Sequence, residues 1–305
     1  MYQVRYDAHT RSIPIRGLNY HLRQWGEPRN NKPPLVLLHG WMDVGASWQF
    51  MVDAFSGSFL DGRMVLAPDW RGFGDTAHHP GVDHYGFADY LADLEFLLDA
   101  LAPDRSVDLL GHSMGGNVAM LYAGIRPNRI RRLINLEGFG MPATRPAQAA
   151  GRYGQWIDEL KALHRGELGL KTYPSRQSVA DRLVRTNPRL DADRALWLAG
   201  HWARPSADGS WAILGDAAHK IVNPHLYRVD EAQAVFQAIQ APTLAVEAEG
   251  DSLQQWWKGR YSLADYHDRL KAVPDCRVAV VADAGHMLHH DQPAILAGLI
   301  ENFLA

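Results

Sequence analysis

A short glycine-flanked segment around Ser113 carries the strongest chemical signal in the sequence. Residues 110–116 read LGHSMGG, a G-x-S-x-G pattern that follows an apolar run and precedes a helical pattern. A sharp strand-to-helix turn lifts the serine hydroxyl out of a sheet, and Gly111 and Gly115 fit such a turn because they lack a Cβ. The N–H of Met114 would then be free to stabilise an oxyanion. The segment predicts a nucleophilic serine at position 113.

His286 is the expected base for this serine. It lies in DAGHMLHHDQP at residues 283–293, after a predicted strand and before the last predicted helix. Serine is a weak nucleophile at neutral pH until a base accepts its proton, and imidazole titrates in the useful range. We expect His289 and His290 to pack or cap in the first turn of that helix. No metal site is predicted, because no matching carboxylate and histidine spacing occurs elsewhere.

Two carboxylates compete for the role of orienting His286. Asp251 follows the predicted strand at residues 243–247 and gives the chain order Ser, Asp, His. Such an acid holds the imidazole in the required tautomer and stabilises the imidazolium. Glu137 follows the preceding predicted strand and is the alternative. Asp251 is the first choice.

The HGW string at residues 39–41 ends the first buried strand and supplies a second oxyanion donor. We expect the main-chain N–H groups of Trp41 and Met114 to form the oxyanion hole, each contributing about 3 kcal/mol to transition-state stabilisation. The Trp41 indole and His112 are the expected substrate contacts, since both adjoin the predicted site.

The elements that must position these residues are read from apolar periodicity. Continuous apolar runs of four to six residues suit strands buried on both faces of a parallel sheet. They occur at residues 34–39, 63–68, 107–110, 132–136, 243–247 and 277–281, after a more polar hairpin at 12–25. Helical patterns at 85–101, 117–124 and 294–304 alternate with them, which predicts right-handed crossovers and a mostly parallel, doubly wound α/β sheet.

Residues 141–241 break this alternation. They contain four tryptophans and several prolines but no convincing buried strand. Because a structureless loop of this length is unusual in a compact domain, we expect a helical cap inserted between two strands. The predicted division is a core domain of residues 1–140 and 242–305 and a cap domain of residues 141–241.

Bulk composition excludes several classes of partner. The chain has 305 residues, a formal net charge of -3 and one cysteine. This charge gives no electrostatic case for nucleic acid or an anionic membrane. One cysteine excludes an internal disulfide framework, and neither a signal peptide nor a membrane-spanning run is expected. The default expectation is a cytoplasmic protein, either monomer or homodimer.

These segments together resemble the α/β-hydrolase superfamily over essentially the whole chain, and the HGWMD string at residues 39–43 is especially similar to bacterial serine-hydrolase and esterase-like members. The resemblance implies a nucleophile elbow at 111–115, a histidine loop at 285–286 and a helical cap over the serine. Residues 242–251 are similar to the family's acid segment, although Ala248 stands where glycine is common. Some members carry the acid after the strand before the cap, which keeps Glu137 open.

The resemblance also sorts the possible chemistries. Haloalkane dehalogenases and epoxide hydrolases of this fold use an aspartate nucleophile, so Ser113 disfavours both. The sequence therefore predicts a serine hydrolase that cleaves an ester or thioester of a hydrophobic small molecule without a cofactor. A C–C-bond hydrolase or lyase, a cofactor-free haloperoxidase with the same triad, and a non-catalytic small-molecule receptor remain alternatives.

Overall fold

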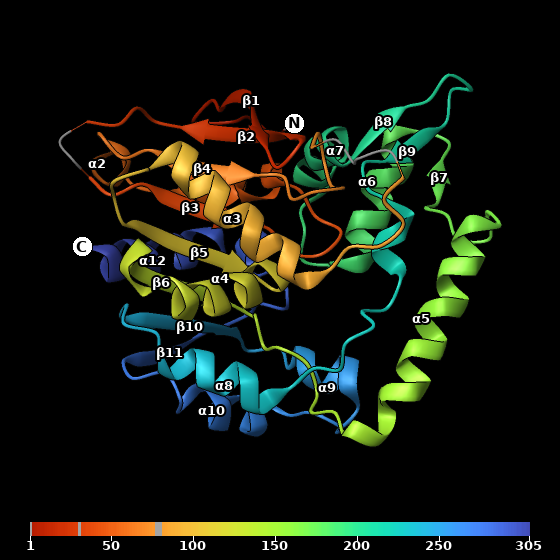
Figure 1. Cartoon of the computed structure of the whole chain (residues 1–305). Helices are drawn as coiled ribbons and strands as arrows, with labels where there is room; N and C mark the ends of the chain where they lie inside the picture. The colour runs from red at the N-terminus through yellow and green to blue at the C-terminus, as the bar shows by residue number, and fades with distance from the viewer. Residues whose placement is uncertain (1, 30–31, 77–80) are drawn as a thin grey trace.

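A mixed β-sheet organises the molecule (Figure 1). The computed structural model describes residues 2–29, 32–76 and 81–305, and within them eight strands form this sheet. The strands are β1 (His9–Ile15), β2 (Leu18–Trp25), β3 (Leu35–Leu38), β4 (Val65–Pro68), β5 (Val107–His112), β6 (Ile130–Leu136), β10 (Thr243–Ala248) and β11 (Cys276–Val281). Their spatial order is β1-β2-β4-β3-β5-β6-β10-β11. The carboxyl ends of β3, β5 and β6 therefore lie side by side.

The sheet is parallel from β4 to β11, whereas β1 and β2 form an antiparallel hairpin at one edge. The hairpin turns at Arg16 and Gly17, both with positive φ, as a type I′ turn requires. Every predicted strand is present, with small shifts in its ends. The other edge strand, β11, differs from expectation because Val278 and Val280 are 48% and 61% exposed. An apolar run does not distinguish an edge strand from a central one.

Helices cover both faces of the sheet. One face is covered by α3 (Phe87–Leu101), α4 (Met114–Ile125), α8 (Val229–Gln237) and α10 (Leu263–Leu270). The other is covered by α1 (Gln49–Ala54), α11 (Leu288–Asp291) and α12 (Pro293–Leu304). Two short helices, α2 (Gly57–Leu60) and α9 (Ser252–Trp257), lie in connections. Each face carries its own buried apolar cluster, which confirms the predicted doubly wound sheet.

The insertion between β6 and β10 is mainly helical. It contains α5 (Ala149–His164), α6 (Arg176–Thr186) and α7 (Ala192–Trp202), which Figure 1 shows at the carboxyl ends of the strands. It also contains a small sheet of β7 (Thr172–Tyr173), β8 (Ala203–Pro205) and β9 (Trp211–Ile213), which the sequence did not predict. α8 lies within the range 141–241 but packs on α4, where a Cβ at Gly124 would overlap the Val235 carbonyl.

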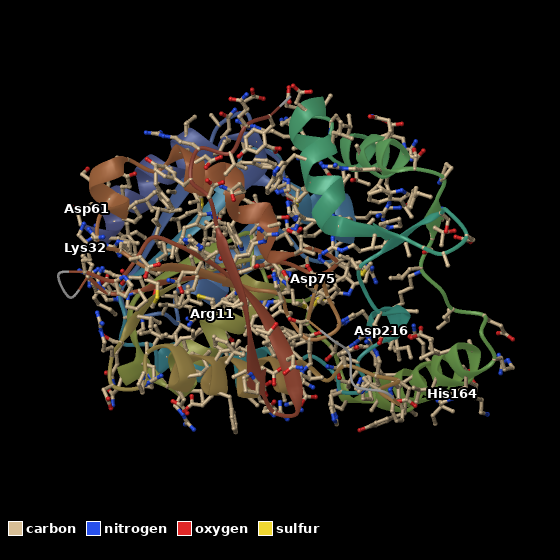
Figure 2. All side chains as sticks on the ribbon, turned by 90° about the horizontal axis from the view of Figure 1, so that it is seen from above. Arg11, Lys32, Asp61, Asp75, His164 and Asp216 are labelled. Atoms are coloured by element: carbon tan, nitrogen blue, oxygen red, sulfur yellow. The ribbon has the colours of Figure 1, made fainter. Side chains whose placement is uncertain are left out.

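Polar and ring contacts join the insertion to the core. Arg204 binds the Asp75 carboxylate through both oxygens at 2.9 and 2.8 Å, and the Tyr85 hydroxyl donates to Asp216 at 2.8 Å. Figure 2 shows Asp75 and Asp216 where the core meets the insertion. The His219 ring stacks on Tyr85 with centroids 3.7 Å apart. These contacts join the insertion to the core at the carboxyl ends of the strands, the side of the sheet on which Ser113 lies.

No helix in the described parts of the chain combines the length and apolar content needed to cross a bilayer.

Candidate active site

Ser113 sits on a strained turn between β5 and α4. Its φ and ψ are 52° and −115°, a conformation that L-residues rarely adopt. A Cβ at Gly111 would overlap the Gly115 carbonyl, and one at Gly115 would overlap the Leu38 carbonyl. The Ser113 N–H donates to Leu136 O at 2.8 Å, which ties the turn to β6. Glycine on either side is thus required for the chain to present this serine at the sheet edge.

The loop after β3 approaches the serine closely. A Cβ at Gly40 would lie 3.0 Å from His112 Nδ1 and 3.2 Å from the Ser113 Cβ, so a side chain at Gly40 would be crowded. Within residues 2–29, 32–76 and 81–305, the main-chain N–H groups of Trp41 and Met114 donate to no protein acceptor. The Trp41 indole is 52% exposed, and its Nε1 donates to His219 O at 3.3 Å. The geometry is compatible with the expected pair of oxyanion donors.

The structure pairs His286 with Glu137. His286 Nδ1 donates to Glu137 Oε2 at 3.2 Å, and the glutamate is only 3% exposed. Glu137 lies one residue beyond β6, in a positive-φ conformation of 54°. Its carboxylate also accepts from the Ala248 N–H and from the Ser252 hydroxyl, both at 2.8 Å. Three donors therefore fix the carboxylate against the imidazole.

Asp251 has a different position from the one expected. It is exposed and is the N-cap of α9, where its side chain accepts from the Gln254 N–H at 2.9 Å. The predicted contact between Asp251 and His286 is therefore corrected in favour of the alternative, Glu137. The reason lies in the strand order: β6 adjoins β5, the strand that ends next to Ser113, whereas β10 lies one strand farther away.

Burial shifts the pKa of both partners toward the neutral forms. Desolvation raises the pKa of Glu137 to about 7, against the opposing effect of the Ala248 and Ser252 hydrogen bonds. The negative charge of Asp251 raises the Glu137 pKa further. Desolvation lowers the pKa of His286 to about 3. The imidazole is therefore a neutral base at pH 7, while the carboxyl titrates near neutrality.

His112 does not have the exposure expected of a substrate contact. It is 1% exposed, and its Nε2 donates to the His286 carbonyl at 2.8 Å. Its ring lies between those of His286 and His289, at centroid distances of 4.7 and 4.5 Å. Burial lowers the pKa of His112 and His289 well below the ordinary value. His112 thus fixes the His286 loop through a hydrogen bond to its main chain.

Two residues of this arrangement are not predicted from the sequence. Ser252 begins α9 and binds Glu137, and Trp256 on the same helix packs edge-to-face on the His286 ring at a centroid distance of 4.3 Å. The Trp256 side chain is 43% exposed. Neither residue belongs to a local motif, so only the fold brings them to His286.

Backbone strain gathers in the loops of the site. Positive φ values of 50–54° occur at Met42, Ser113, Glu137 and Asp283, which lie in the loops after β3, β5, β6 and β11. Such conformations cost about 1–3 kcal/mol each and persist where the surrounding structure enforces them. They gather at the carboxyl ends of the sheet strands, the same side of the sheet as the candidate site.

Comparisons with known proteins agree with the geometry. A serine hydrolase-like protein of Danio rerio is 26% identical over 290 residues, which cover 92% of this chain and 86% of the relative. An sn-1-specific diacylglycerol lipase of Mus musculus is 26% identical over 275 residues, covering 90% and 81%. The solved thioesterase domain from the curacin biosynthetic pathway superposes with a TM-score of 0.81 at 24% identity, covering 96% of this chain and 99% of that domain.

The family model described as alpha/beta hydrolase fold matches residues 33–293, which include the Ser113, Glu137 and His286 loops. With this match over most of its length, the chain belongs to the α/β-hydrolase fold family.

Proposed function

We propose that this protein hydrolyses carboxylic esters of hydrophobic small molecules through a Ser113–His286–Glu137 triad and an acyl-enzyme. The observation that carries the proposal is the contact of His286 Nδ1 with the buried Glu137 carboxylate. This contact keeps the ring proton on Nδ1. The lone pair of Nε2 is then free to accept the serine proton.

In the first half-reaction, His286 takes the Ser113 proton while Oγ attacks the ester carbonyl. The N–H groups of Met114 and Trp41 stabilise the oxyanion. His286 then returns the proton to the leaving alcohol, and the acyl group stays on Ser113. In the second half-reaction, His286 deprotonates a water that attacks the acyl-enzyme. Collapse of that intermediate releases the acid and restores the serine.

Two exposed indoles support a hydrophobic substrate. Trp41 adjoins the loop that contacts Ser113, and Trp256 packs on His286. Large aromatic side chains beside a reaction centre bind apolar groups while their N–H groups remain satisfied at the edge. The lipase relative acts on an ester, which is in keeping with this chemistry.

The test is the turnover of p-nitrophenyl esters of increasing chain length, together with labelling by a fluorophosphonate. We expect Ser113→Ala to lower kcat/KM on the order of 10⁴-fold or more and to abolish labelling. Ser206→Ala, in the turn between β8 and β9, is the matched control and should behave as wild type. Equal turnover in wild type and Ser113→Ala would refute the proposal. Tight binding of an ester without turnover would instead favour a receptor.

A further inference from the structure

A buried cluster of three side chains lies directly behind the candidate active site. Asp43 follows β3, His112 ends β5, and His289 lies on α11; they are 4%, 1% and 0% exposed. One donor atom from each lies within 4.8 Å of the others. The sequence predicts no metal site, because no ligand spacing is visible along the chain. These residues come from three distant segments, so spacing along the chain does not reveal them.

Four polar atoms of the cluster have no protein partner within the described residues. They are Asp43 Oδ2, His112 Nδ1 and both ring nitrogens of His289. The separation between His289 Nε2 and Asp43 Oδ2 is 4.0 Å, too long for a hydrogen bond. A buried polar atom left without a partner costs about 1–3 kcal/mol. Four such atoms in one cluster indicate a binding site for a ligand that satisfies them.

The tautomer of His112 determines which of its ring nitrogens can act as a ligand. Because His112 Nε2 donates to the His286 carbonyl, Nδ1 of the neutral ring carries an unshared lone pair. Histidines that bind metals commonly donate their other N–H to a carbonyl in this way. On Asp43, Oδ1 accepts from the Val44 N–H at 2.9 Å, from Trp202 Nε1 at 3.0 Å and from the Ser47 hydroxyl. Oδ2 is left facing the imidazoles with no donor.

A second cluster, of one histidine and two aspartates, behaves differently. His21, Asp69 and Asp75 also bring their donor atoms together. There, however, Asp69 is satisfied by His21 Nδ1 at 2.8 Å and by the N–H groups of Gly45 and Asp75 at 2.6 and 2.9 Å. The Asp69 carboxylate is thus satisfied by protein donors. His21 therefore provides a control position for the metal-binding test.

The distances within the cluster allow two kinds of occupant, a water molecule or a metal ion. Two groups that share one water at about 2.8 Å lie roughly 4.6 Å apart. Two ligands of a tetrahedral zinc ion at about 2.0–2.1 Å lie about 3.4 Å apart. The Asp43–His289 separation of 4.0 Å differs by about 0.6 Å from either value, so the chemistry of the donors decides between them. Two imidazoles and one carboxylate form a donor set typical of zinc and similar divalent ions.

We propose that Asp43, His112 and His289 form a binding site for Zn²⁺ or a similar borderline divalent cation, with water as the fourth ligand. Each ligand lies within three residues of Trp41, Ser113 or His286. Drawing the ligands together displaces the loops that carry these groups, and a displacement of about 1 Å can cost on the order of 100-fold in rate. Occupancy is therefore expected to inhibit turnover, a consequence that rests on the proposed esterase function, whereas binding itself does not.

Binding is tested by calorimetric titration of the chelator-treated full chain with ZnCl₂. We expect one equivalent of zinc to bind, at least 100-fold more weakly in His289→Gln and unchanged in His21→Gln. Ser113→Ala should bind zinc as wild type does, so a failed esterase proposal leaves this result intact. Absence of binding at millimolar zinc, which would mean that water alone occupies the cluster, or unchanged affinity in His289→Gln would overturn the proposal.

A spectroscopic measurement covers the case in which His289→Gln does not fold, as judged by circular dichroism. Wild type loaded with one equivalent of Co²⁺ should show the strong visible absorption of a tetrahedral site. X-ray absorption of the zinc form should show two imidazole ligands with oxygen completing the shell. Ligation by the thiolate of Cys276, or by oxygen alone, would contradict the assignment. Zinc inhibition is then compared with the zinc-free rate of each folded variant.

Discussion

Glu137 and Asp251 are two carboxylates that follow neighbouring strands of one sheet, yet their surroundings are opposite. Glu137 is buried, strained and held by Ala248, Ser252 and His286. Asp251 is exposed, and its side chain caps the short helix α9. The two are nevertheless linked, because α9 begins with the Ser252 that binds Glu137. The comparison teaches that a position after a strand permits an acid at the site, whereas the strand order determines which carboxylate contacts the imidazole.

The largest expected contrast is in turnover. Glu137→Gln should lower kcat/KM for an ester by about 10³- to 10⁴-fold, since the imidazole loses the charge that stabilises its protonated form. Asp251→Asn, a matched change from acid to amide, should change it less than about threefold. Steady-state kinetics of both variants checks this. The reverse result would restore Asp251 as the acid.

The next contrast is in the pH dependence of stability. Because the folded-state pKa of Glu137 is raised to about 7, the folded state favours the protonated carboxyl. The resulting stabilisation is full below the unfolded pKa and is lost as pH rises through 7, by about 3 kcal/mol in all. Glu137→Gln removes this loss, so urea unfolding should show the variant gaining stability relative to wild type between pH 5 and pH 8. A constant difference across that range would contradict the raised pKa.

A smaller effect is expected at Ser252. Its hydroxyl stabilises the ionised form of Glu137, so Ser252→Ala raises the Glu137 pKa further. The rise of kcat/KM with pH should move to higher pH, and activity at pH 7 should fall about 10-fold, the value of one hydrogen bond to a charged group. An unchanged pH profile would mean that the hydroxyl does not act through Glu137.

The smallest effect has the opposite sign and comes from Asp251. Its negative charge raises the Glu137 pKa, so Asp251→Asn should move the same pH limb to lower pH by about a few tenths of a unit. Asparagine also caps helices well, which keeps α9 in place. A shift in the same direction as in Ser252→Ala would show that α9, rather than charge, controls the site.

The sequence predicts much of the fold because its signals are local. The apolar runs that form β3, β4, β5, β6, β10 and β11 and the glycines around Ser113 are each recognisable within a few residues. The small sheet of β7, β8 and β9 is missed because each strand has only two or three residues, too few to show a periodic pattern. The edge position of β11 is missed because an apolar run does not show whether a strand has neighbouring strands on one side or on both.

The site is less predictable where it depends on contacts between distant segments. Chain order favours Asp251, whereas the strand order places β6, which precedes Glu137, beside β5. His112 adjoins Ser113 in sequence, but alternation along β5 turns its side chain into the interior, toward His286 and His289. Trp256 reaches His286 only because α9 packs beside the histidine loop.

The most direct test of the triad is the rate at which a fluorophosphonate labels Ser113 in the Glu137→Gln and Asp251→Asn variants, followed by intact-protein mass. Labelling reports the first nucleophilic step alone, apart from deacylation and product release. The triad proposed here predicts that Asp251→Asn is labelled at the wild-type rate and Glu137→Gln at least about 100-fold more slowly. Fast labelling of Glu137→Gln together with slow labelling of Asp251→Asn would contradict it.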